Sequence, residues 1–302
     1  MKTKIVLWIE KFFYQPSNAQ IWLSKILLPL SWLYCFIMKL RYLMISSYDF
    51  DMNIISIGNL TVGGSGKTPL TIAIAKQYSQ VAVILRGYGR DSEGLHVVSD
   101  GNSILTNVKI SGDEAMIYAQ KLKHAVVIVS EDRIKGILKA REMGAKIIFL
   151  DDGYSKHNIK KLDFLIVSNV KNSACLPAGP YRERAWRDKN IEYIYEDKDF
   201  QRSVKIINPT KKMVLATAIA RASRLDAFLP EIVNKYYFED HYSFTKEELV
   251  DIMDKNRATS LLVTYKDYVK IQDFNLNVSI LDLHIDVNER IFNIIDRYIK
   301  GL

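Results

Sequence analysis

The chain has 302 residues, of which 48% are hydrophobic and 25% charged, proportions that are ordinary for a globular protein. That length suits one large or two modest domains with a sizeable buried core. The formal net charge of +8 is compatible with nucleic acid, anionic lipid or a phosphorylated substrate, and it does not choose among them. The two cysteines, Cys35 and Cys175, lack metal-ligand spacing and give no sign of a disulfide framework, which is typical of a reducing compartment.

Residues 1–50 contain a candidate membrane-surface helix. Residues 26–38 are 13 uncharged residues between two lysines, whereas a helix needs about 20 apolar residues to span a bilayer. Pro29 is expected to interrupt this stretch, and aromatic and basic residues flank it, as is usual at the level of the lipid headgroups. We therefore expect residues 17–45 to form an interfacial helix that lies on a membrane. The alternatives are a helix pair packed on the protein's own core and a single-pass anchor over residues 21–45.

A glycine-rich loop follows a short apolar stretch at residues 53–57 and precedes an apolar helical pattern. In this loop, which we call the phosphate loop (residues 58–68), successive backbone N–H groups can converge on phosphate. Lys67 adds a cation for the β- and γ-phosphates, and the Thr68 hydroxyl can bind Mg²⁺. Thr61 stands where the strict pattern has glycine, and a connector that binds nothing is the alternative. We predict that nucleotide phosphate binds to Thr61, Val62, Gly63, Gly64, Ser65, Gly66, Lys67 and Thr68.

Short apolar runs alternate with helical patterns from residue 51 to residue 170. The runs have the length of buried strands and lie at residues 81–85, 125–130, 146–150 and 163–168. This alternation predicts a mostly parallel sheet with helices on both faces, as in phosphate-loop nucleotide-binding proteins. No internal repeat or low-complexity tract is present in the sequence.

Acidic residues occur at two places near the ends of these elements. Ser111 and Glu114 match a capping box, and Asp113 falls in a first helical turn, where the helix dipole stabilises a carboxylate; structural roles are therefore favoured for these residues. The strand at residues 146–150 ends in Asp151-Asp152-Gly153. This is the arrangement of a Walker-B strand, whose carboxylate lies near the Mg²⁺ of a phosphate loop. A tight Asp-Gly turn is the alternative, and the upstream phosphate loop favours the metal role.

The last third of the chain is predicted to form a smaller lobe. Residues 191–195 and 204–207 suggest a strand pair within a linker over residues 191–212. Residues 213–302 then resume a strand–helix series, which predicts a small C-terminal α/β lobe. Residues 51–190 are left as the nucleotide-binding core.

Three features of this region bear on function. The arginine-rich stretch at residues 176–187 fits either a phosphate clamp or a solvated linker. His241 is a lone histidine, and such a residue is more often structural than catalytic. Thr264-Tyr265-Lys266-Asp267 does not match a guanine-reading loop, in which lysine directly follows the first residue, so GTP is not indicated.

Several motifs occur together in one order along the chain: Pro29-Leu30-Ser31-Trp32-Leu33-Tyr34, Gly58-Asn59-Leu60-Thr61-Val62-Gly63-Gly64-Ser65-Gly66-Lys67-Thr68-Pro69, Arg86-Gly87-Tyr88-Gly89, Gly112-Asp113-Glu114, Asp151-Asp152-Gly153, Leu176-Pro177-Ala178-Gly179-Pro180, Asp240-His241 and Lys266-Asp267. Each motif is weak alone, but their order and combination are specific. In this combination the chain resembles the tetraacyldisaccharide 4′-kinase family, the lipid A kinases of Gram-negative bacteria. The family shares the threonine of the phosphate loop, so Thr61 no longer counts against nucleotide binding.

The resemblance implies transfer of the ATP γ-phosphoryl group to the 4′-hydroxyl of a tetraacyldisaccharide 1-phosphate, an acylated glucosamine disaccharide, at the cytoplasmic face of the inner membrane. It implies that Asp113 and His241 act as an acid/base pair, which reverses the structural roles favoured above. It also implies that Lys67 steadies the β- and γ-phosphates and that Mg²⁺ is bound by Thr68, Asp151 or Asp152, and Glu183. Residues 17–45 would contact the membrane, and no nucleic-acid partner is expected.

The sequence departs from the family pattern at three places. A histidine is shifted by one position to His157, Arg86 stands where serine is usual, and residues 217–228 lack a Gly-Ile-Gly-x-Pro pattern. We therefore assign His157 no role. Two other functions stay open: a soluble phosphate-loop kinase of a small polar metabolite, with residues 17–45 packed internally, and a nucleotide-switched membrane-binding module without phosphoryl transfer. The motifs indicate no oligomeric state.

Overall fold

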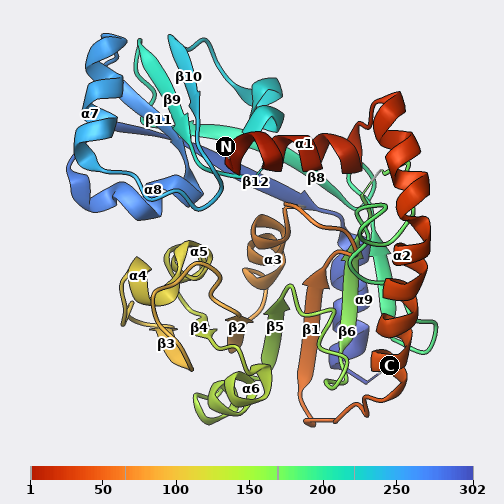
Figure 1. Cartoon of the computed structure of the whole chain (residues 1–302). Helices are drawn as coiled ribbons and strands as arrows, with labels where there is room; N and C mark the ends of the chain where they lie inside the picture. The colour runs from red at the N-terminus through yellow and green to blue at the C-terminus, as the bar shows by residue number, and fades with distance from the viewer. Residues whose placement is uncertain (1, 65, 169, 221, 302) are drawn as a thin grey trace.

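The computed structural model describes residues 2–64, 66–168, 170–220 and 222–301. Two lobes lie one above the other in Figure 1, each built on its own sheet. The first lobe has a seven-stranded sheet within residues 53–194, and the second lobe has a five-stranded sheet within residues 200–287. Neighbouring strands in both sheets are mostly parallel. The predicted α/β class, with a phosphate-loop sheet and a smaller C-terminal lobe, is confirmed.

The first sheet has the strand order β3-β4-β2-β5-β1-β6-β7. Its strands are β1 (Asn53–Gly58), β2 (Val81–Leu85), β3 (His96–Asp100), β4 (Val126–Val129), β5 (Ile147–Asp151), β6 (Leu162–Ile166) and β7 (Ile191–Ile194). The described pairings are parallel except that β3 runs antiparallel to β4. Ile57 of β1 lies opposite Asp151 of β5. The phosphate loop after β1 and the carboxylates at the end of β5 therefore emerge at the same edge of the sheet.

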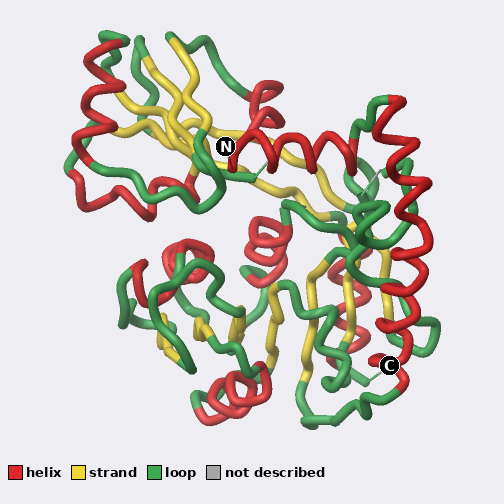
Figure 2. Tube along the Cα trace, in the orientation of Figure 1, coloured by secondary structure: helices red, strands yellow, loops and turns green. Residues whose placement is uncertain are grey.

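Helices cover both faces of the first sheet, because alternate side chains of its strands point to opposite faces (Figure 2). One core contains Ile55 and Phe149 together with side chains of helices that include α3 (Lys67–Ala75), α5 (Asp113–Lys121) and α9 (Glu289–Ile299). The opposite core contains Ile54 and Ile148 together with side chains of α6 (Arg133–Glu142). Burial on both faces explains why these strands are continuous apolar runs in the sequence. The short α4 (Val108–Ser111) directly precedes α5.

The second sheet has the strand order β10-β9-β11-β12-β8. Its elements are β8 (Phe200–Ile207), β9 (Met213–Thr217), the 3₁₀ helix η1 (Ala222–Phe228), β10 (Asn234–Tyr237), α7 (Lys246–Lys255), β11 (Ser260–Thr264), α8 (Tyr265–Ile271), the 3₁₀ helix η2 (Gln272–Phe274) and β12 (Val278–Val287). The predicted pairing of residues 191–195 with residues 204–207 is wrong. Instead, β7 pairs with β6, and β8 pairs antiparallel to β12. Thus β7 is an edge strand of the first sheet, and β8 is an edge strand of the second.

The N-terminal helices α1 (Lys2–Tyr14) and α2 (Asn18–Leu43) lie outside both sheets, and α2 runs along the side of the first lobe (Figure 1). The expected interruption at Pro29 is wrong, since α2 continues through this residue. Within the described part of the chain, α2 is the one helix whose length and composition would allow it to cross a membrane.

One side of α2 is fastened to residues 172–184, which we call the connecting segment. Ser31 Oγ donates a hydrogen bond of 2.8 Å to the Cys175 carbonyl and accepts one of 2.9 Å from Ala178 N. Cys35 of α2 forms a disulfide bond with Cys175. The sequence-based expectation for these two cysteines is therefore wrong. They are 140 residues apart, and only the fold shows that their Cα atoms are close enough to be bridged.

Candidate functional site

The phosphate loop joins β1 to α3 at the carboxyl edge of the first sheet. Two of its glycines have a positive φ, +93° at Gly63 and +78° at Gly66, a backbone region that favours glycine. Gly66 is the N-cap of α3, so the loop leads directly to the free N–H groups at the start of this helix. The predicted phosphate ligand Ser65 lies outside the described residues.

Neighbouring segments hold the phosphate loop in place. Val62 N donates a hydrogen bond of 2.9 Å to the Pro180 carbonyl in the connecting segment. Thr61 is buried and forms a β-bridge with Tyr181 of the same segment. The Tyr14 hydroxyl at the end of α1 donates to the Val62 carbonyl. The threonine at position 61 thus contributes to the attachment of the loop.

Lys67 and Thr68, the first residues of α3, face the two carboxylates that follow β5. Lys67 Nζ donates to Asn59 Oδ1 at 3.1 Å and lies 3.7 Å from Asp152 Oδ1. Thr68 Oγ1 donates to Asp151 Oδ2 at 3.3 Å. The structure therefore brings the phosphate-loop lysine and threonine together with the predicted Walker-B carboxylates.

Asp151 and Asp152 have different surroundings. Asp151 Oδ2 accepts a hydrogen bond of 2.9 Å from the Tyr118 hydroxyl, while its buried Oδ1 has no hydrogen-bond partner among the described residues. Burial raises the pKa of Asp151, although the Lys67 ammonium opposes this effect. Asp152 accepts hydrogen bonds of 2.5 and 2.8 Å from Arg182. Burial acts to raise the pKa of Asp152, but Lys67 and Arg182 outweigh it and the pKa is lowered.

The surroundings of Thr68 and Asp151 fit a magnesium ion that is completed by phosphate oxygens. Mg²⁺ in phosphoryl-transfer sites is usually held by one or two carboxylates together with substrate phosphates. Across the described ranges, no three His, Cys, Asp or Glu side chains gather to hold a metal on their own. The unpartnered Asp151 Oδ1 is the protein oxygen that an ion would satisfy. Glu183 Oε2 lies 3.5 Å from His157 Nε2, and its place among the metal ligands stays a prediction.

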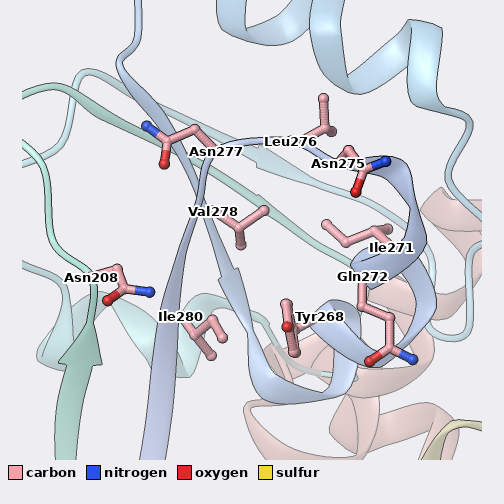
Figure 3. Close-up of a pocket in the computed structure, with 9 residues that line it drawn as sticks. All are labelled: Asn208, Tyr268, Ile271, Gln272, Asn275, Leu276, Asn277, Val278 and Ile280. Atoms are coloured by element: carbon pink, nitrogen blue, oxygen red, sulfur yellow. The ribbon is translucent and has the colours of Figure 1, made fainter.

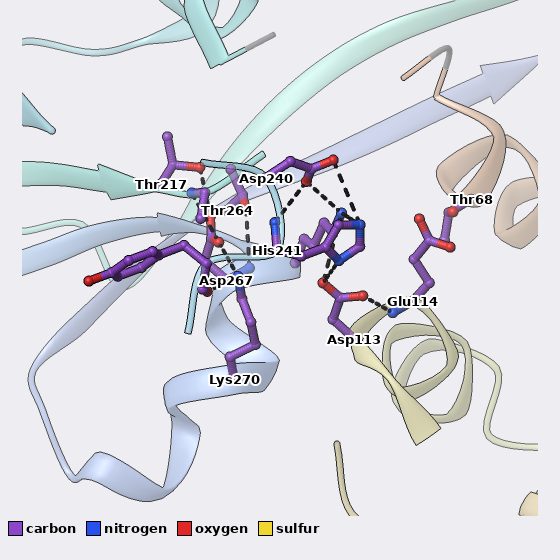
Figure 4. A network of polar contacts seen from close by, with 12 residues as sticks. Thr68, Asp113, Glu114, Thr217, Asp240, His241, Thr264, Asp267 and Lys270 are labelled. Carbon is purple, nitrogen blue, oxygen red and sulfur yellow. Dashed lines mark hydrogen bonds and ion pairs between the residues drawn. The ribbon is translucent and has the colours of Figure 1, made fainter. Parts of the chain in front are cut away.

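A second pair of functional groups joins the two lobes. His241 Nδ1 of the second lobe lies 3.0 Å from Asp113 Oδ2 at the start of α5 (Figure 4). The other carboxylate oxygen of Asp113 accepts a hydrogen bond of 2.8 Å from Glu114 N. His241 has a φ of +61°, a strained value for a residue other than glycine. Its ring packs against Tyr88, with 5.0 Å between the ring centroids.

The contact changes the proton affinity of both partners. Burial acts to raise the pKa of Asp113, but the hydrogen bond with His241 and the charge of Lys266 outweigh burial and lower it. Burial acts to lower the pKa of His241, but its hydrogen bond and charge interaction with Asp113 raise it above the ordinary value. Asp113 is therefore ionised at neutral pH, and the imidazole is the group that takes up or releases a proton there.

Glu114 lies at the candidate site. Its predicted role in a capping box with Ser111 is wrong. Ser111 ends α4, and Gly112 rather than Ser111 is the N-cap of α5. Figure 4 shows the Glu114 side chain turned toward Thr68. Burial, followed by the charge of Asp151, raises the pKa of Glu114 to about 7. A carboxyl group that titrates near neutral pH therefore lies close to both Asp151 and the Asp113–His241 pair.

Two arginines of the second lobe reach the phosphate loop and were not predicted. Arg224 Nη1 donates a hydrogen bond of 3.2 Å to the Gly64 carbonyl. A Cβ atom placed on Gly66 would lie 2.9 Å from Arg202 Nη2, so the guanidinium group packs directly against this glycine. The sequence carries no signal for these contacts, because η1 and β8 lie far along the chain from the loop.

The second lobe also contains a cavity of about 290 Å³ (Figure 3). Its lining comes from residues near β8, α8, η2 and β12: Asn208, Tyr268, Ile271, Gln272, Asn275, Leu276, Asn277, Val278 and Ile280. None of these lining residues was predicted to be functional. The chemistry-bearing groups instead meet where the second lobe contacts the phosphate loop.

The strand order, the phosphate loop and the carboxylates after β5 define a nucleotide-binding α/β protein of the phosphate-loop class. The family model for tetraacyldisaccharide-1-P 4′-kinase matches residues 23–300. The chain belongs to this family, and the resemblance noted from its motifs is confirmed.

Individual relatives match over nearly their whole length. The chain is 46% identical over 312 residues to the tetraacyldisaccharide 4′-kinase of Aliarcobacter butzleri, a match that covers 100% of this chain and 99% of the relative. It is 48% identical over 296 residues to the tetraacyldisaccharide 4′-kinase of Helicobacter pylori, covering 96% and 94%. A crystal structure of LpxK from Aquifex aeolicus in complex with ATP superposes with a TM-score of 0.70 at 25% identity, covering 92% of this chain and 99% of that one.

Proposed function

We propose that the protein transfers the γ-phosphoryl group of ATP to the 4′-hydroxyl of a tetraacyldisaccharide 1-phosphate, a step of lipid A biosynthesis. The observation that carries this proposal is the 3.0 Å contact between Asp113 and His241 beside a phosphate loop. A nucleotide-binding module without transfer would have no need for an acid/base pair at that place. The names of the relatives at 46 and 48% identity support the acceptor, and the ATP complex of the Aquifex aeolicus protein supports the donor.

The geometry supports a specific division of tasks. Asp113 holds the Nδ1 proton of His241, which leaves Nε2 to accept the proton of the attacking hydroxyl. The oxygen then bonds to the γ-phosphorus as the bond to the β-phosphate oxygen breaks, and ADP leaves with its charge near the Lys67 ammonium. Mg²⁺ held by Thr68 and Asp151 would neutralise charge on the phosphates. Glu183 is a further proposed ligand of this ion.

Basic side chains next to the carboxylates support a phosphorylated acceptor. Burial lowers the pKa of Arg133 to about 10, and its charged neighbours include Asp151 and Arg86. Burial and then the charges of Arg133, Arg86 and Arg41 lower the pKa of Lys156. Burial and nearby positive charges thus disfavour the charged forms of Arg133 and Lys156, and an anionic ligand would relieve both. The 1-phosphate of the acceptor is such a ligand.

The outer side of α2 supports docking to a membrane surface through residues 17–45. Trp22 and Ile26 are 66 and 72% exposed, while the opposite side of the helix is fastened to the connecting segment by Ser31 and Cys35. An exposed apolar helix face of this length is unfavourable in water, and its burial at a lipid interface lowers the free energy. The acceptor is itself a lipid, so a peripheral or monotopic position on the cytoplasmic face of the inner membrane brings the enzyme to its substrate.

We expect the Trp22→Glu/Ile26→Glu double variant to bind lipid vesicles at least about tenfold more weakly than the wild type. The substitutions replace two exposed apolar side chains by charges that an acyl-chain environment disfavours. Flotation with phosphatidylcholine vesicles containing anionic phospholipid measures the bound fraction. Leu105→Glu, which changes an apolar residue that is 53% exposed elsewhere on the first lobe, serves as the matched control. A wild type that does not float would instead support a soluble kinase.

The proposed reaction is tested with labelled ATP and a purified acyl-disaccharide 1-phosphate. We expect a Mg²⁺-dependent product that carries label at the 4′ position and no comparable labelling of the same disaccharide without acyl chains. Binding of ATP without any phosphorylated product would contradict the proposal and favour a nucleotide-switched membrane-binding module. Preferential labelling of a small polar metabolite would favour the soluble kinase.

A further inference from the structure

Lys266 lies beside the Asp113–His241 pair, and the proposed reaction gives it no task. Its Nζ atom is 3.3 Å from His241 Nε2 and 3.0 Å from Asp240 Oδ1. The same atom is 3.8 Å from Asp113 Oδ2. The side chain is only 19% exposed, so these contacts are sheltered from solvent.

A buried carboxylate next to Lys266 fixes the start of α8. Asp267 accepts hydrogen bonds from the hydroxyl groups of Thr217 and Thr264, at 2.6 and 2.7 Å, and from Ala218 N at 3.2 Å. His241 N in turn donates to the Ala218 carbonyl at 3.3 Å. Lys266 and His241 are thus anchored to the same end of β9, and their contact follows from the fold of the second lobe.

The contact between Lys266 and His241 selects one tautomer of the imidazole. A lysine ammonium has only donors, so it can bond to Nε2 only when that nitrogen carries no proton. The ring proton then lies on Nδ1, where it bonds to Asp113 Oδ2. Protonation of Nε2 would place an N–H group against the ammonium, which costs electrostatic energy in a sheltered site.

We propose that Lys266 is a positioning residue that holds His241 in its proton-accepting tautomer until the acceptor hydroxyl takes the place of the lysine at Nε2. Asp240 then keeps the displaced ammonium, since its Oδ1 is already 3.0 Å from Nζ. This inference rests on the proposed kinase function and adds a residue that acts through His241. A cation at this place preserves the base in its neutral form between turnovers.

The surrounding charges set the direction of the effect. His241 faces Asp113 and Glu114 from α5, Lys266 and, farther away, Lys270 from α8, Asp240 from its own loop, and the neutral ring of Tyr88. Burial acts to lower the pKa of His241, Asp113 and Asp240 raise it, and the Lys266 ammonium lowers it. Removal of the ammonium therefore raises the pKa of His241 further and frees Nε2 to take a proton.

NMR of ¹⁵N-histidine-labelled protein tests the proposal without a substrate. The signals of His241 are assigned by comparison with His241→Gln. We expect wild-type His241 to show a proton on Nδ1 and an unprotonated Nε2 above its titration midpoint. In Lys266→Met we expect the midpoint to rise by about one pH unit. Lys266→Gln is a second neutral variant, and Lys246→Met, at an exposed lysine of α7, is the matched control. A midpoint equal to that of the wild type in the neutral variants would overturn the proposal.

The pH profile of kcat/KM then links the titration to catalysis. We expect the acidic limb to shift upward in Lys266→Met by the same amount as the His241 midpoint, and to return toward the wild-type position in Lys266→Arg. A titration shift without any shift of this limb would exclude a role of Lys266 in the reaction. If wild-type protein phosphorylates no acyl-disaccharide, the proposed function fails, whereas the NMR titration still decides whether Lys266 controls His241.

Discussion

Asp113→Ala and His241→Ala are each expected to lower turnover by on the order of 10²-fold or more while ATP binding is retained. His241→Ala removes the proton acceptor of the attacking hydroxyl, and Asp113→Ala removes the hydrogen bond that orients this acceptor. Because the two groups act as one unit, the double variant should lose little more than the worse single variant. Steady-state turnover and ATP titration calorimetry measure the two quantities.

The matched control for the histidine substitution is His124→Ala, which changes an exposed histidine of the first lobe. We expect this control to keep wild-type turnover. Circular dichroism and thermal melting establish that each variant is folded. Wild-type turnover in folded Asp113→Ala or His241→Ala would refute the assignment of the pair.

Asp151→Asn is expected to reduce turnover by about 10²- to 10³-fold, and Asp152→Asn by clearly less. Asp151 has a buried oxygen without a partner and stands next to Thr68, whereas Asp152 is already neutralised by Arg182 and Lys67. Burial raises the pKa of Asp151, so its ionised form is unfavourable in the folded protein. Asp151→Asn should therefore melt no lower than the wild type, as expected for a residue that function retains at a cost in stability.

Turnover measured over a range of Mg²⁺ concentrations separates the two carboxylates. A direct ligand lost in Asp151→Asn raises the Mg²⁺ concentration needed for half-maximal rate. Loss of the ion pair in Asp152→Asn mainly changes the position of Arg182 and Lys67. A larger loss of turnover in Asp152→Asn would assign the ion to that carboxylate instead.

The local parts of the fold and site followed from the sequence because each depends on neighbouring residues. Continuous apolar runs predicted the buried strands, since the first sheet is covered on both faces. The four glycines of the phosphate loop predicted a backbone able to converge on phosphate, and two of them, Gly63 and Gly66, adopt positive φ values. The apolar residues of 26–38 predicted an exposed N-terminal helix, although Pro29 does not interrupt it.

Contacts between residues that are far apart in the sequence could not be predicted from local patterns. Asp113 and His241 are 128 residues apart, and each alone has an ordinary structural explanation; only the resemblance to a family linked them. Ser111 and Glu114 have the spacing of a capping box, but the N-cap of α5 is Gly112, one residue after Ser111. The contact of Asp113 with His241 arises where the two lobes meet, and that of Lys266 with His241 arises from the fold of the second lobe. No local pattern encodes either contact.

The connecting segment lies between α2 and the phosphate loop, and it has a mechanical consequence. Ser31 and Cys35 attach it to the helix, and Pro180 bonds to Val62 on its other side. When α2 rests on a bilayer, this arrangement sets the height at which a γ-phosphate is held above the lipid surface. At the proposed membrane position the active site would lie at a fixed distance from the lipid surface, and the sugar headgroup would have to rise to that level while its acyl chains stay below.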